Sequence, residues 1–436
     1  MMKPQVCLRD FIPRPETNKM TGLVKLTCLL LVFCAATLSS SAQTFTSLAT
    51  FDGANGSYPF APLVQATNGN FYGTTKYGGA FGNGTVFTVS PNGVARKLYN
   101  FCTQVNCGDG YWPVNGLVEA PNHDLYGMTP GGSTNNSGTL FKITPGGEFT
   151  EFYRFCSQTS CTDGLGPSAL LVAANGNLYG TTYDGGANCT LYLGCGTFFE
   201  ITPAGQLTTL YNFCSQTNSQ GYCTDGLYPV SLLQGTDGNF YGTTQMGGGN
   251  CCSGVIFKIT PAGKFTILYN FSGGSATSLT QGANGNLYGT IAPNGFPGEI
   301  FEVSLAGKFT ILHDFCSKKN CADGSHPSPT LIQASDGNFY GTTVFGGSNT
   351  CVLQGSAVGC GTIFKITPRG KLTTLYSFCS QAMCTDGSSP EAGLIQGTDG
   401  LLYGTTKSGG DPACTLASGC GEAFSFDVGL PPPAKQ

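Results

Sequence analysis

The chain has 436 residues, of which 40% are apolar and only 10% charged, and its formal net charge is −4. This composition excludes intrinsic disorder, which requires low hydrophobicity and high charge, and it excludes nucleic-acid binding through a basic surface. With 65 Gly, 30 Phe and 19 Tyr, the chain is poor helix material and suits short strands joined by tight turns.

Residues 1–42 have the features of a leader that ends in a secretory signal peptide. From Met20, the expected start of translation, a lysine precedes a largely apolar run over residues 26–38, and Ala42 is the small residue required before the cleavage site. No later apolar run reaches the roughly 18 residues that span a membrane. We therefore expect a secreted protein, extracellular or periplasmic, with no membrane span.

Removal of the leader makes the chain more acidic. The leader holds five of the 20 basic residues and two of the 24 acidic ones, so the mature chain has 15 basic against 22 acidic residues and a net charge of −7. An acidic surface disfavours DNA and acidic lipid as partners. The last residues, 429–436, are expected to form a short Pro-rich tail.

One phrase, Asn/Asp-Leu/Phe-Tyr-Gly-Thr-Thr, recurs with small variations along the chain. Its tyrosines are Tyr72, Tyr126, Tyr179, Tyr241, Tyr288, Tyr340 and Tyr403. Around each lie four strand-like runs, seen in residues 227–271 as A (VSLLQG), B (NFYGTT), C (GVIFKIT) and D (KFTILYNF). Asn-Gly or Asp-Gly turns join A to B in all but one unit, and Thr-Pro-x-Gly joins C to D, so each unit is predicted to be an antiparallel meander.

Seven such units, each of about 50 residues, predict an all-β, seven-bladed β-propeller with four-stranded antiparallel blades over residues 43–428. A linear solenoid is the competing arrangement. The mature sequence opens with a D strand that no A, B or C strand precedes, and it ends with a C strand, 421–428, that no D strand follows. Residues 44–51 are therefore predicted to pair as the outer strand of the blade formed by 389–428, which closes the ring.

These units resemble the GloVer tandem repeat of exported bacterial proteins, whose pattern runs DGxxPxxxLxxxxDGNLYGTTxxGGxxxxGTxFKxTPxGxxTxLYxF. The resemblance covers essentially all of residues 44–428. It implies a propeller-like extracellular protein, and no defined activity goes with the repeat.

The cysteines that follow the leader occur in twos, and every loop between strands has none or two. The pairs between strands D and A are Cys102/Cys107, Cys156/Cys161, Cys214/Cys223, Cys316/Cys321 and Cys379/Cys384. The pairs between strands B and C are Cys189/Cys195, Cys251/Cys252, Cys351/Cys360 and Cys414/Cys420. This pattern predicts local disulfides in an exported protein, although whether the adjacent pair joins to itself stays open. Zinc is the alternative, but the spacing lacks CxxC motifs and neighbouring His pairs, so no metal is expected.

In an up-and-down blade, the D–A and B–C connections emerge on one face, and the A–B and C–D turns emerge on the other. All the cysteine pairs are therefore predicted on the first face, which we name the stapled face; the other is the turn face. Function commonly resides on long loops held by a rigid scaffold, so we expect a ligand at the stapled face.

An Asp-Gly pair precedes strand A in six units, and the carboxylates are expected near the axis on the stapled face. They are Asp52, Asp109, Asp163, Asp225, Asp323 and Asp386. A ring of carboxylates suits Ca²⁺ or sugar hydroxyls as ligands. The alternative is that each aspartate caps the backbone of its own turn.

Other candidates divide into repeated and unrepeated residues. The recurring tyrosines are either platforms for sugars or, as repetition favours, core residues packed between neighbouring sheets with hydroxyls bonded to backbone. The repeated lysines Lys142, Lys258 and Lys365 are expected on solvated strand faces, and the three histidines, His123, His313 and His326, are expected to be structural because they lie in different units. Unrepeated aromatic residues on the stapled face are the better candidates for ligand contact, namely Tyr111, Trp112, Tyr192 and Tyr222.

The sequence thus predicts a secreted, monomeric, disulfide-stapled binding module for an extracellular glycan or protein, with no catalytic residues and no cofactor unless the aspartates hold Ca²⁺. One alternative is a propeller-type carbohydrate-active enzyme or lyase that uses carboxylates of the stapled face, which requires two carboxyls roughly 5–10 Å apart. A second alternative is a purely structural envelope protein.

Overall fold

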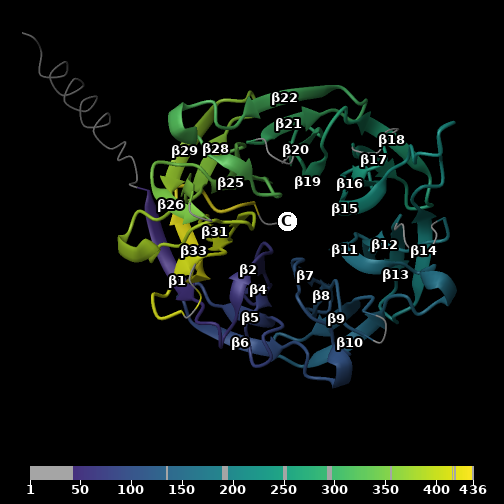
Figure 1. Ribbon diagram of the computed structural model, residues 1–436, viewed down its shortest axis with the longest axis horizontal. Coiled ribbons are helices and arrows are strands. Elements are labelled where there is room, and N and C mark those ends of the chain that lie inside the picture. Colours follow the sequence, from purple (N-terminus) through teal and green to yellow (C-terminus); the bar gives the residue numbers. More distant parts are fainter. Residues whose placement is uncertain are drawn as a thin grey trace, which may run out of the picture. The chain divides into compact units, whose positions relative to one another are not determined.

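A computed structural model describes residues 43–434 except 134–135, 189–194, 249–252, 292–296, 354–355, 415 and 417–418. Over these residues the chain forms seven antiparallel blades of four strands around a central axis, which confirms the predicted propeller (Figure 1). The predicted leader, residues 1–42, lies outside them. Within the described part of the chain, no helix is long and apolar enough to cross a membrane.

The blades follow one another in chain order, and each runs from an inner strand A to an outer strand D. Blade 1 has β2 (Ser57–Pro59), β3 (Val64–Gln65), β4 (Phe71–Tyr77), β5 (Thr85–Val89) and β6 (Ala95–Asn100). Blade 2 has β7 (Val118–Glu119), β8 (Leu125–Thr129), β9 (Thr139–Ile143) and β10 (Phe149–Arg154). Blade 3 has β11 (Leu165–Val172), β12 (Leu178–Asp184), β13 (Thr197–Ile201) and β14 (Leu207–Asn212). Blade 4 has β15 (Leu227–Gln234), β16 (Phe240–Met246), β17 (Val255–Ile259) and β18 (Phe265–Asn270).

The remaining blades carry two additions to the meander. Blade 5 has β19 (Ala276–Gln281), β20 (Leu287–Ile291), β21 (Glu299–Val303) and β22 (Phe309–Asp314). Blade 6 has β23 (Ser325–Pro327), β24 (Ile332–Gln333), β25 (Phe339–Phe345), β28 (Thr362–Ile366) and β29 (Leu372–Ser377), and its B–C loop forms a hairpin of β26 (Thr350–Leu353) and β27 (Ser356–Gly359). Blade 7 has β30 (Ile395–Gln396), β31 (Leu402–Thr406), β33 (Gly419–Asp427) and β1 (Thr44–Thr50), with β32 (Gly409–Gly410) beside β33. Short 3-10 turns occupy four D–A loops, namely η1 (Val105–Cys107), η2 (Thr159–Cys161), η3 (Lys319–Cys321) and η4 (Ala382–Cys384).

Strand A is interrupted in some blades because proline stands in the middle of it. In blade 1, β2 and β3 both pair with β4, and Pro62 lies between them. In blade 6, Pro329 lies between β23 and β24, which both pair with β25. Proline has no N–H to donate to a β-ladder. The inner wall of these blades is therefore partly irregular backbone.

The ring closes through the first strand, as the sequence predicts. β1 pairs antiparallel with β33, from Thr44 opposite Asp427 to Thr50 opposite Glu422. The ring of Phe45 stacks on Tyr376 of blade 6 with centroids 4.7 Å apart. The N-terminal strand thus supplies the missing outer strand of blade 7 and leaves β33 with no free edge.

Aromatic contacts between blades form the core. The recurring tyrosines of strand B are at most 5% exposed, which confirms the core reading over the sugar-platform reading. Tyr403 of blade 7 stacks on Phe71 of blade 1 with centroids 3.9 Å apart, and Tyr288 packs on Phe339 of the next blade at 4.2 Å. Their hydroxyls do not bond to backbone as predicted but to side chains, since Tyr403 donates to Asp399 of the A–B turn at 2.6 Å.

The residue of strand C that faces the A–B turn is complementary to the side chain in that turn. Asp237 in the turn of blade 4 accepts a hydrogen bond from Lys258 at 3.0 Å, whereas Asn284 in the turn of blade 5 donates to Glu302 at 3.2 Å. The other repeated lysines, Lys142 and Lys365, lie within 3.2 and 2.7 Å of carboxylates of Asp124 and Asp336. The prediction that these lysines lie on solvated strand faces is therefore wrong, because each is paired with a carboxylate of the A–B turn.

A buried carboxyl lies at the closing seam. Glu422 of β33 is 0% exposed, and its Oε2 accepts a hydrogen bond from Ser47 of β1 at 2.5 Å, while Oε1 has no partner among the described residues. Burial raises the pKa of Glu422 to about 8, the bond from Ser47 opposes this rise, and the negative charge of Asp386 adds to it.

Replacement Glu422→Gln should stabilise the protein at alkaline pH. An unfolded chain releases this proton near its ordinary pKa of 4.5 and the folded chain only near 8, so the free energy of unfolding falls as pH rises between these values. We expect E422Q to exceed the parent protein by roughly 2–4 kcal/mol at pH 9 and by much less at pH 5 in urea unfolding. An equal difference at both pH values would contradict a protonated carboxyl at the seam.

Candidate functional site

Seven of the predicted cysteine pairs are disulfides in the structure. They are Cys102–Cys107, Cys156–Cys161, Cys214–Cys223, Cys316–Cys321, Cys351–Cys360, Cys379–Cys384 and Cys414–Cys420. Disulfides of this number are typical of an exported protein.

The remaining predicted cysteines do not belong to these seven pairs. Cys195 is 3% exposed and is disulfide-bonded, but its predicted partner Cys189 lies outside the described residues. The predicted pairing of Cys195 with Cys189 therefore stays a prediction. Cys251 and Cys252 also lie outside the described residues, as does the aromatic candidate Tyr192.

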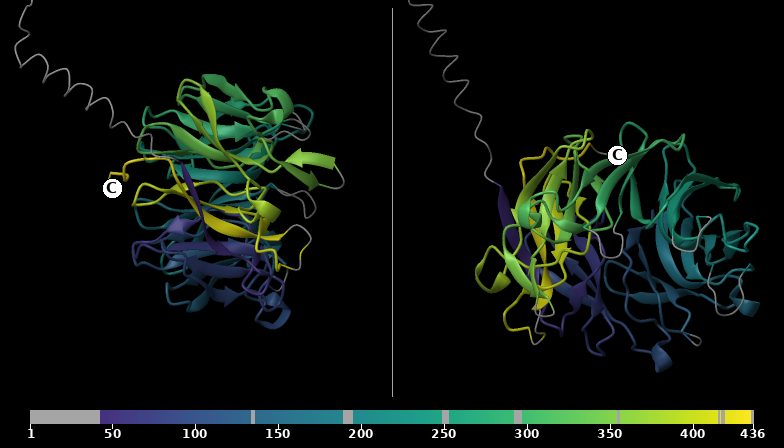
Figure 2. Two further views of the ribbon diagram at one scale, coloured as in Figure 1. Left: turned by 90° about the vertical axis from the view of Figure 1, so that its left-hand side faces the viewer. Right: turned by 45° about the horizontal axis from the view of Figure 1, so that its top comes forward.

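The two faces of the propeller differ as the topology requires. In the edge-on view the hairpin β26–β27 projects from the stapled face, while the C-terminal tail lies on the turn face (Figure 2). The tail is held there because the carbonyl of Pro431 accepts hydrogen bonds from Ser335 at 2.6 Å and Gln396 at 3.0 Å. The long loops, which are the candidates for ligand contact, therefore lie on the stapled face.

The repeated aspartates do not form an open ring of carboxylates. Asp109 is 0% exposed, its Oδ2 accepts from the Tyr99 hydroxyl at 2.7 Å and from the Thr103 amide at 2.9 Å, and its Oδ1 accepts from the Gln104 amide at 3.2 Å. The same burial and the same set of loop donors recur at Asp163, Asp225, Asp323 and Asp386. These five residues brace their own loops, as the capped-turn reading predicts, and their oxygens are buried and accept hydrogen bonds from those loops.

Blade 5 shows how tightly this bracing is specified. There His313 replaces the tyrosine of strand D, and its Nε2 lies 3.2 Å from Asp323 Oδ2. Burial lowers the pKa of His313, although the charge of Asp323 opposes the shift. The position keeps a hydrogen-bonding ring in place, so this histidine is structural, as expected.

The residue before the proline of strand A has a left-handed backbone in six blades. These residues have φ between 52° and 62°, in the left-handed region, and they are Tyr58, Trp112, Gly166, Tyr228, His326 and Ser389. A proline disfavours helical backbone in the residue before it, and the left-handed region costs a non-glycine residue about 1–3 kcal/mol. The amide of this residue bonds to the B–C loop of the preceding blade, as Trp112 does to the Asn83 carbonyl at 2.9 Å and Ser389 to the Cys360 carbonyl at 2.8 Å. Contact between blades thus holds the strained conformation.

A second variable position follows the Gly-Thr-Thr of strand B, where that strand reaches the stapled face. Its described residues are Lys76, Pro130, Tyr183, Gln245, Val344 and Lys407. Three of these, Pro130, Tyr183 and Gln245, line a central cavity of about 850 Å³, together with inner-strand residues of all seven blades such as Phe60 and Glu391. We name the pre-proline and strand-end residues, which lie where strands A and B meet the stapled face, the rim.

The richest part of the rim lies on blades 1 and 2, where aromatic rings meet a cation. The rings of Tyr58 and Trp112 pack edge-on against Tyr77, with centroids 5.7 and 6.0 Å away. The Lys76 ammonium lies 5.2 Å from the centre of the Tyr77 ring and 5.4 Å from that of Phe60. Trp112 is 41% exposed. We name these five residues the aromatic cluster.

Elsewhere on the rim, polar groups are paired. Tyr183 stacks on Tyr228 at 4.5 Å and donates its hydroxyl to Gln245 at 2.7 Å. Lys407 lies 2.7 Å from Glu391, so the charge of that carboxylate is neutralised. Burial raises the pKa of Asp184, which also lines the cavity.

The other aromatic candidates have different settings. Tyr111 packs its ring against Gly131 and donates its hydroxyl to Asn136, so it braces a loop. Tyr222 is 45% exposed, but its described bonds stay within its own loop, where its amide donates to Asn218. Of the predicted aromatic contacts, Trp112 belongs to the aromatic cluster and Tyr111 adjoins it, because the ring of Tyr111 packs edge-on against Trp112 with centroids 4.8 Å apart.

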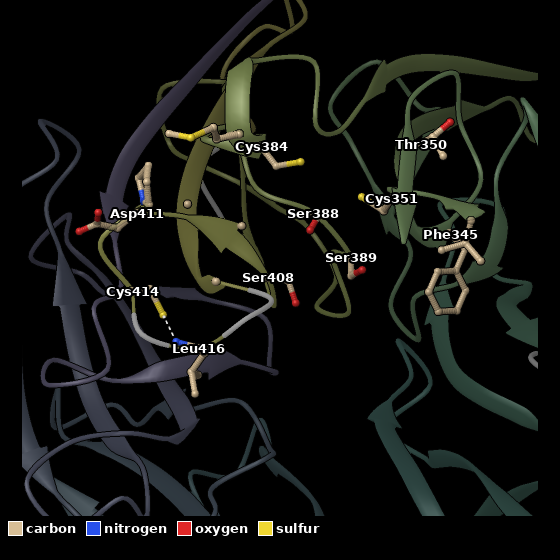
Figure 3. Close-up of a pocket in the computed structure, with 16 residues that line it drawn as sticks. Phe345, Thr350, Cys351, Cys384, Ser388, Ser389, Ser408, Asp411, Cys414 and Leu416 are labelled. Atoms are coloured by element: carbon tan, nitrogen blue, oxygen red, sulfur yellow. Dashed lines mark hydrogen bonds between the residues drawn. The ribbon is translucent and has the colours of Figure 1, made fainter. Parts of the chain in front are cut away.

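A second cavity of about 640 Å³ lies on the stapled face between blades 6 and 7 (Figure 3). Ser388, Ser389 and Ser408 lie between Cys351 on one side and Cys414 on the other. The sulfurs of Cys351, Cys379 and Cys384 lie within 4.8 Å of one another, as metal ligands do. All three sulfurs are held in disulfides, so they offer no thiolate to a metal.

The chain resembles known proteins in sequence and in fold. A family model described as the Gloeobacter/Verrucomicrobia repeat matches residues 34–193 and 193–424. The extracellular domain of a hybrid two-component system from B. thetaiotaomicron superposes with a TM-score of 0.53 at 13% identity, over 91% of this chain and 44% of that one. A protein from Lactobacillus plantarum gives 0.48 at 15% identity, over 73% and 84%. A PQQ-bound aldose sugar dehydrogenase from Streptomyces coelicolor gives 0.42 at 10%, over 89% and 99%.

Of these three structures, only the first has a TM-score above 0.5, and its likeness bears on the fold alone. The chain spans less than half the length of the two-component domain, and all three structures share at most 15% of its residues. No curated protein sequence matches the chain.

Replacement Met383→Asn should stabilise the D–A loop before blade 7. Met383 is 76% exposed with φ 56°, whereas Asn106 and Asn320 occupy the same position with φ 55° and 57° in other loops. Asparagine tolerates the left-handed region better than an unbranched apolar residue does. We expect a gain of about 0.5–1 kcal/mol in the free energy of unfolding, measured by denaturant titration.

The matched control is Val105→Asn, an 87% exposed residue of the equivalent loop before blade 2 whose φ is not positive. It should bring no gain. A loss of stability in M383N, or an equal gain in both variants, would refute backbone strain at Met383.

Proposed function

The chain belongs to the Gloeobacter/Verrucomicrobia repeat family, and from that premise we propose that it is an exported, non-catalytic binding module that recognises an extracellular glycan at its rim. It acts as a monomer outside the cytoplasm, in the periplasm or beyond the cell. The observation that carries the proposal is the placement of variable residues. The repeat keeps the scaffold constant in every blade, while the pre-proline and strand-end positions change from blade to blade. Four of these residues line the central cavity, namely Pro130, Gly166, Tyr183 and Gln245.

Aromatic side chains at the rim favour a glycan over a protein partner. Trp112, Tyr77 and Tyr58 meet in one cluster, and tryptophan and tyrosine combine an apolar ring face with a polar edge, as sugar rings require. Serine, threonine and asparagine side chains line the cavity below, among them Asn115, Thr277 and Thr330. A concave site with a few polar groups suits a small ligand better than the broad, flat surface of a protein.

Catalysis is the weaker alternative. A glycosidase requires an acid and a second carboxylate facing the same bond. The carboxyls that line the cavity are Asp184 of blade 3 and Glu391 of blade 7, and Glu391 is held in an ion pair with Lys407. Binding without chemistry therefore agrees better with the site.

The single tryptophan of the chain provides the test. Trp112 is both the sole tryptophan and a partly exposed member of the aromatic cluster, so its fluorescence reports directly on occupancy of the rim. We expect a glycan retained from an array to change this fluorescence with saturation, and Trp112→Ala to weaken binding at least tenfold in calorimetry.

The control is Tyr222→Ala, which removes an equally exposed aromatic ring from another loop of the stapled face. Its affinity should equal that of the parent. If no glycan of the array changed the Trp112 fluorescence, or if both variants lost affinity equally, the rim would not be the binding site.

A further inference from the structure

The positive charge of Lys76 at the rim indicates which class of ligand the rim binds. Lys76 occupies the strand-end position of blade 1, which corresponds to Tyr183 in blade 3 and Gln245 in blade 4. Both of those side chains line the central cavity. Lys76 itself is not part of the lining, but its ammonium lies over Phe60, which is.

Lys76 has no anionic partner among the described residues. The other lysine at this position, Lys407, lies 2.7 Å from Glu391, and Lys258 of strand C lies 3.0 Å from Asp237. Lys76 makes no such ion pair, and its described contacts are the rings of Phe60 and Tyr77. The cluster thus presents an uncompensated positive charge on a protein whose mature net charge is −7.

The neighbouring charges leave that positive sign intact. The Lys407 ammonium also lies over Phe60, at 6.0 Å, and its ion pair with Glu391 is neutral as a whole. Together, Lys76, Lys407 and Glu391 carry one positive charge. An ammonium beside aromatic faces is well placed to attract a single carboxylate while the rings contact apolar surface.

We propose that the rim selects an acidic sugar, a uronic acid unit of an extracellular polysaccharide, whose carboxylate pairs with Lys76 while its ring lies against Trp112 and Tyr77. This rests on the proposed function and adds to it the class of sugar and the residue that chooses it. A lysine is suited to binding a single carboxylate, because its ammonium is a compact point charge on a flexible side chain. The negative net charge of the whole chain restricts the attraction to this spot and disfavours polyanions of high charge density.

The experiment is a Trp112 fluorescence titration with trisaccharides of galacturonic, mannuronic and guluronic acid, each beside its neutral counterpart of the same linkage. We expect at least one uronate to bind tenfold or more tightly than its neutral counterpart, and 1 M salt to reduce that preference. Lys76→Gln should abolish the preference, so that each uronate and its neutral counterpart bind with equal affinity.

Lys264→Gln serves as the charge-matched control, because Lys264 is exposed in the C–D turn of blade 4 on the turn face. It should keep the full preference. Equal affinity for acidic and neutral sugars, or a preference that survives in K76Q, would overturn the assignment of Lys76 while the binding module stands. Failure of acidic and neutral sugars alike to change the fluorescence would overturn both proposals.

Discussion

Pairing of the first strand with the last blade is the interaction on which the rest of the molecule depends. β1 completes blade 7, and Tyr403 then stacks on Phe71 across the seam. The rim itself crosses this seam, because Lys407 of blade 7 lies 5.8 Å from the centre of the Tyr58 ring of blade 1. Without closure the blades would form a row, and the residues around the central cavity would not face one another.

Constant positions of the repeat form the scaffold, and variable positions form the rim. Constant residues brace each loop, as the aspartates do, or hold neighbouring blades together, as the strand-B tyrosines do. The left-handed pre-proline conformation also recurs, and a hydrogen bond from the backbone N–H of that residue to the neighbouring blade maintains it. Because the backbone of each rim position is fixed by its neighbours, its side chain is free to change, and strain of this kind commonly gathers at functional sites.

Much of this fold follows from sequence because the signals are local. Alternation, Asn-Gly turns and paired cysteines each act over a few residues, and the unpaired strands at the two ends predict the closure. The site was harder to predict. The burial of Asp109 depends on donors from its own folded loop, and the lack of an anionic partner for Lys76 among the described residues depends on every residue around it. A signal was nevertheless present, since the residues before the repeated proline and after Gly-Thr-Thr vary while their neighbours do not.

Hydrogen–deuterium exchange of the β1 amides tests closure most directly. In the closed ring, the amides of Thr44–Thr50 that face β33 are as protected as those of the outer strands β6 and β10, and they exchange together with β33. Exchange of β1 at the rate of an unstructured peptide, with β33 protected only on its side towards β31, would contradict the account.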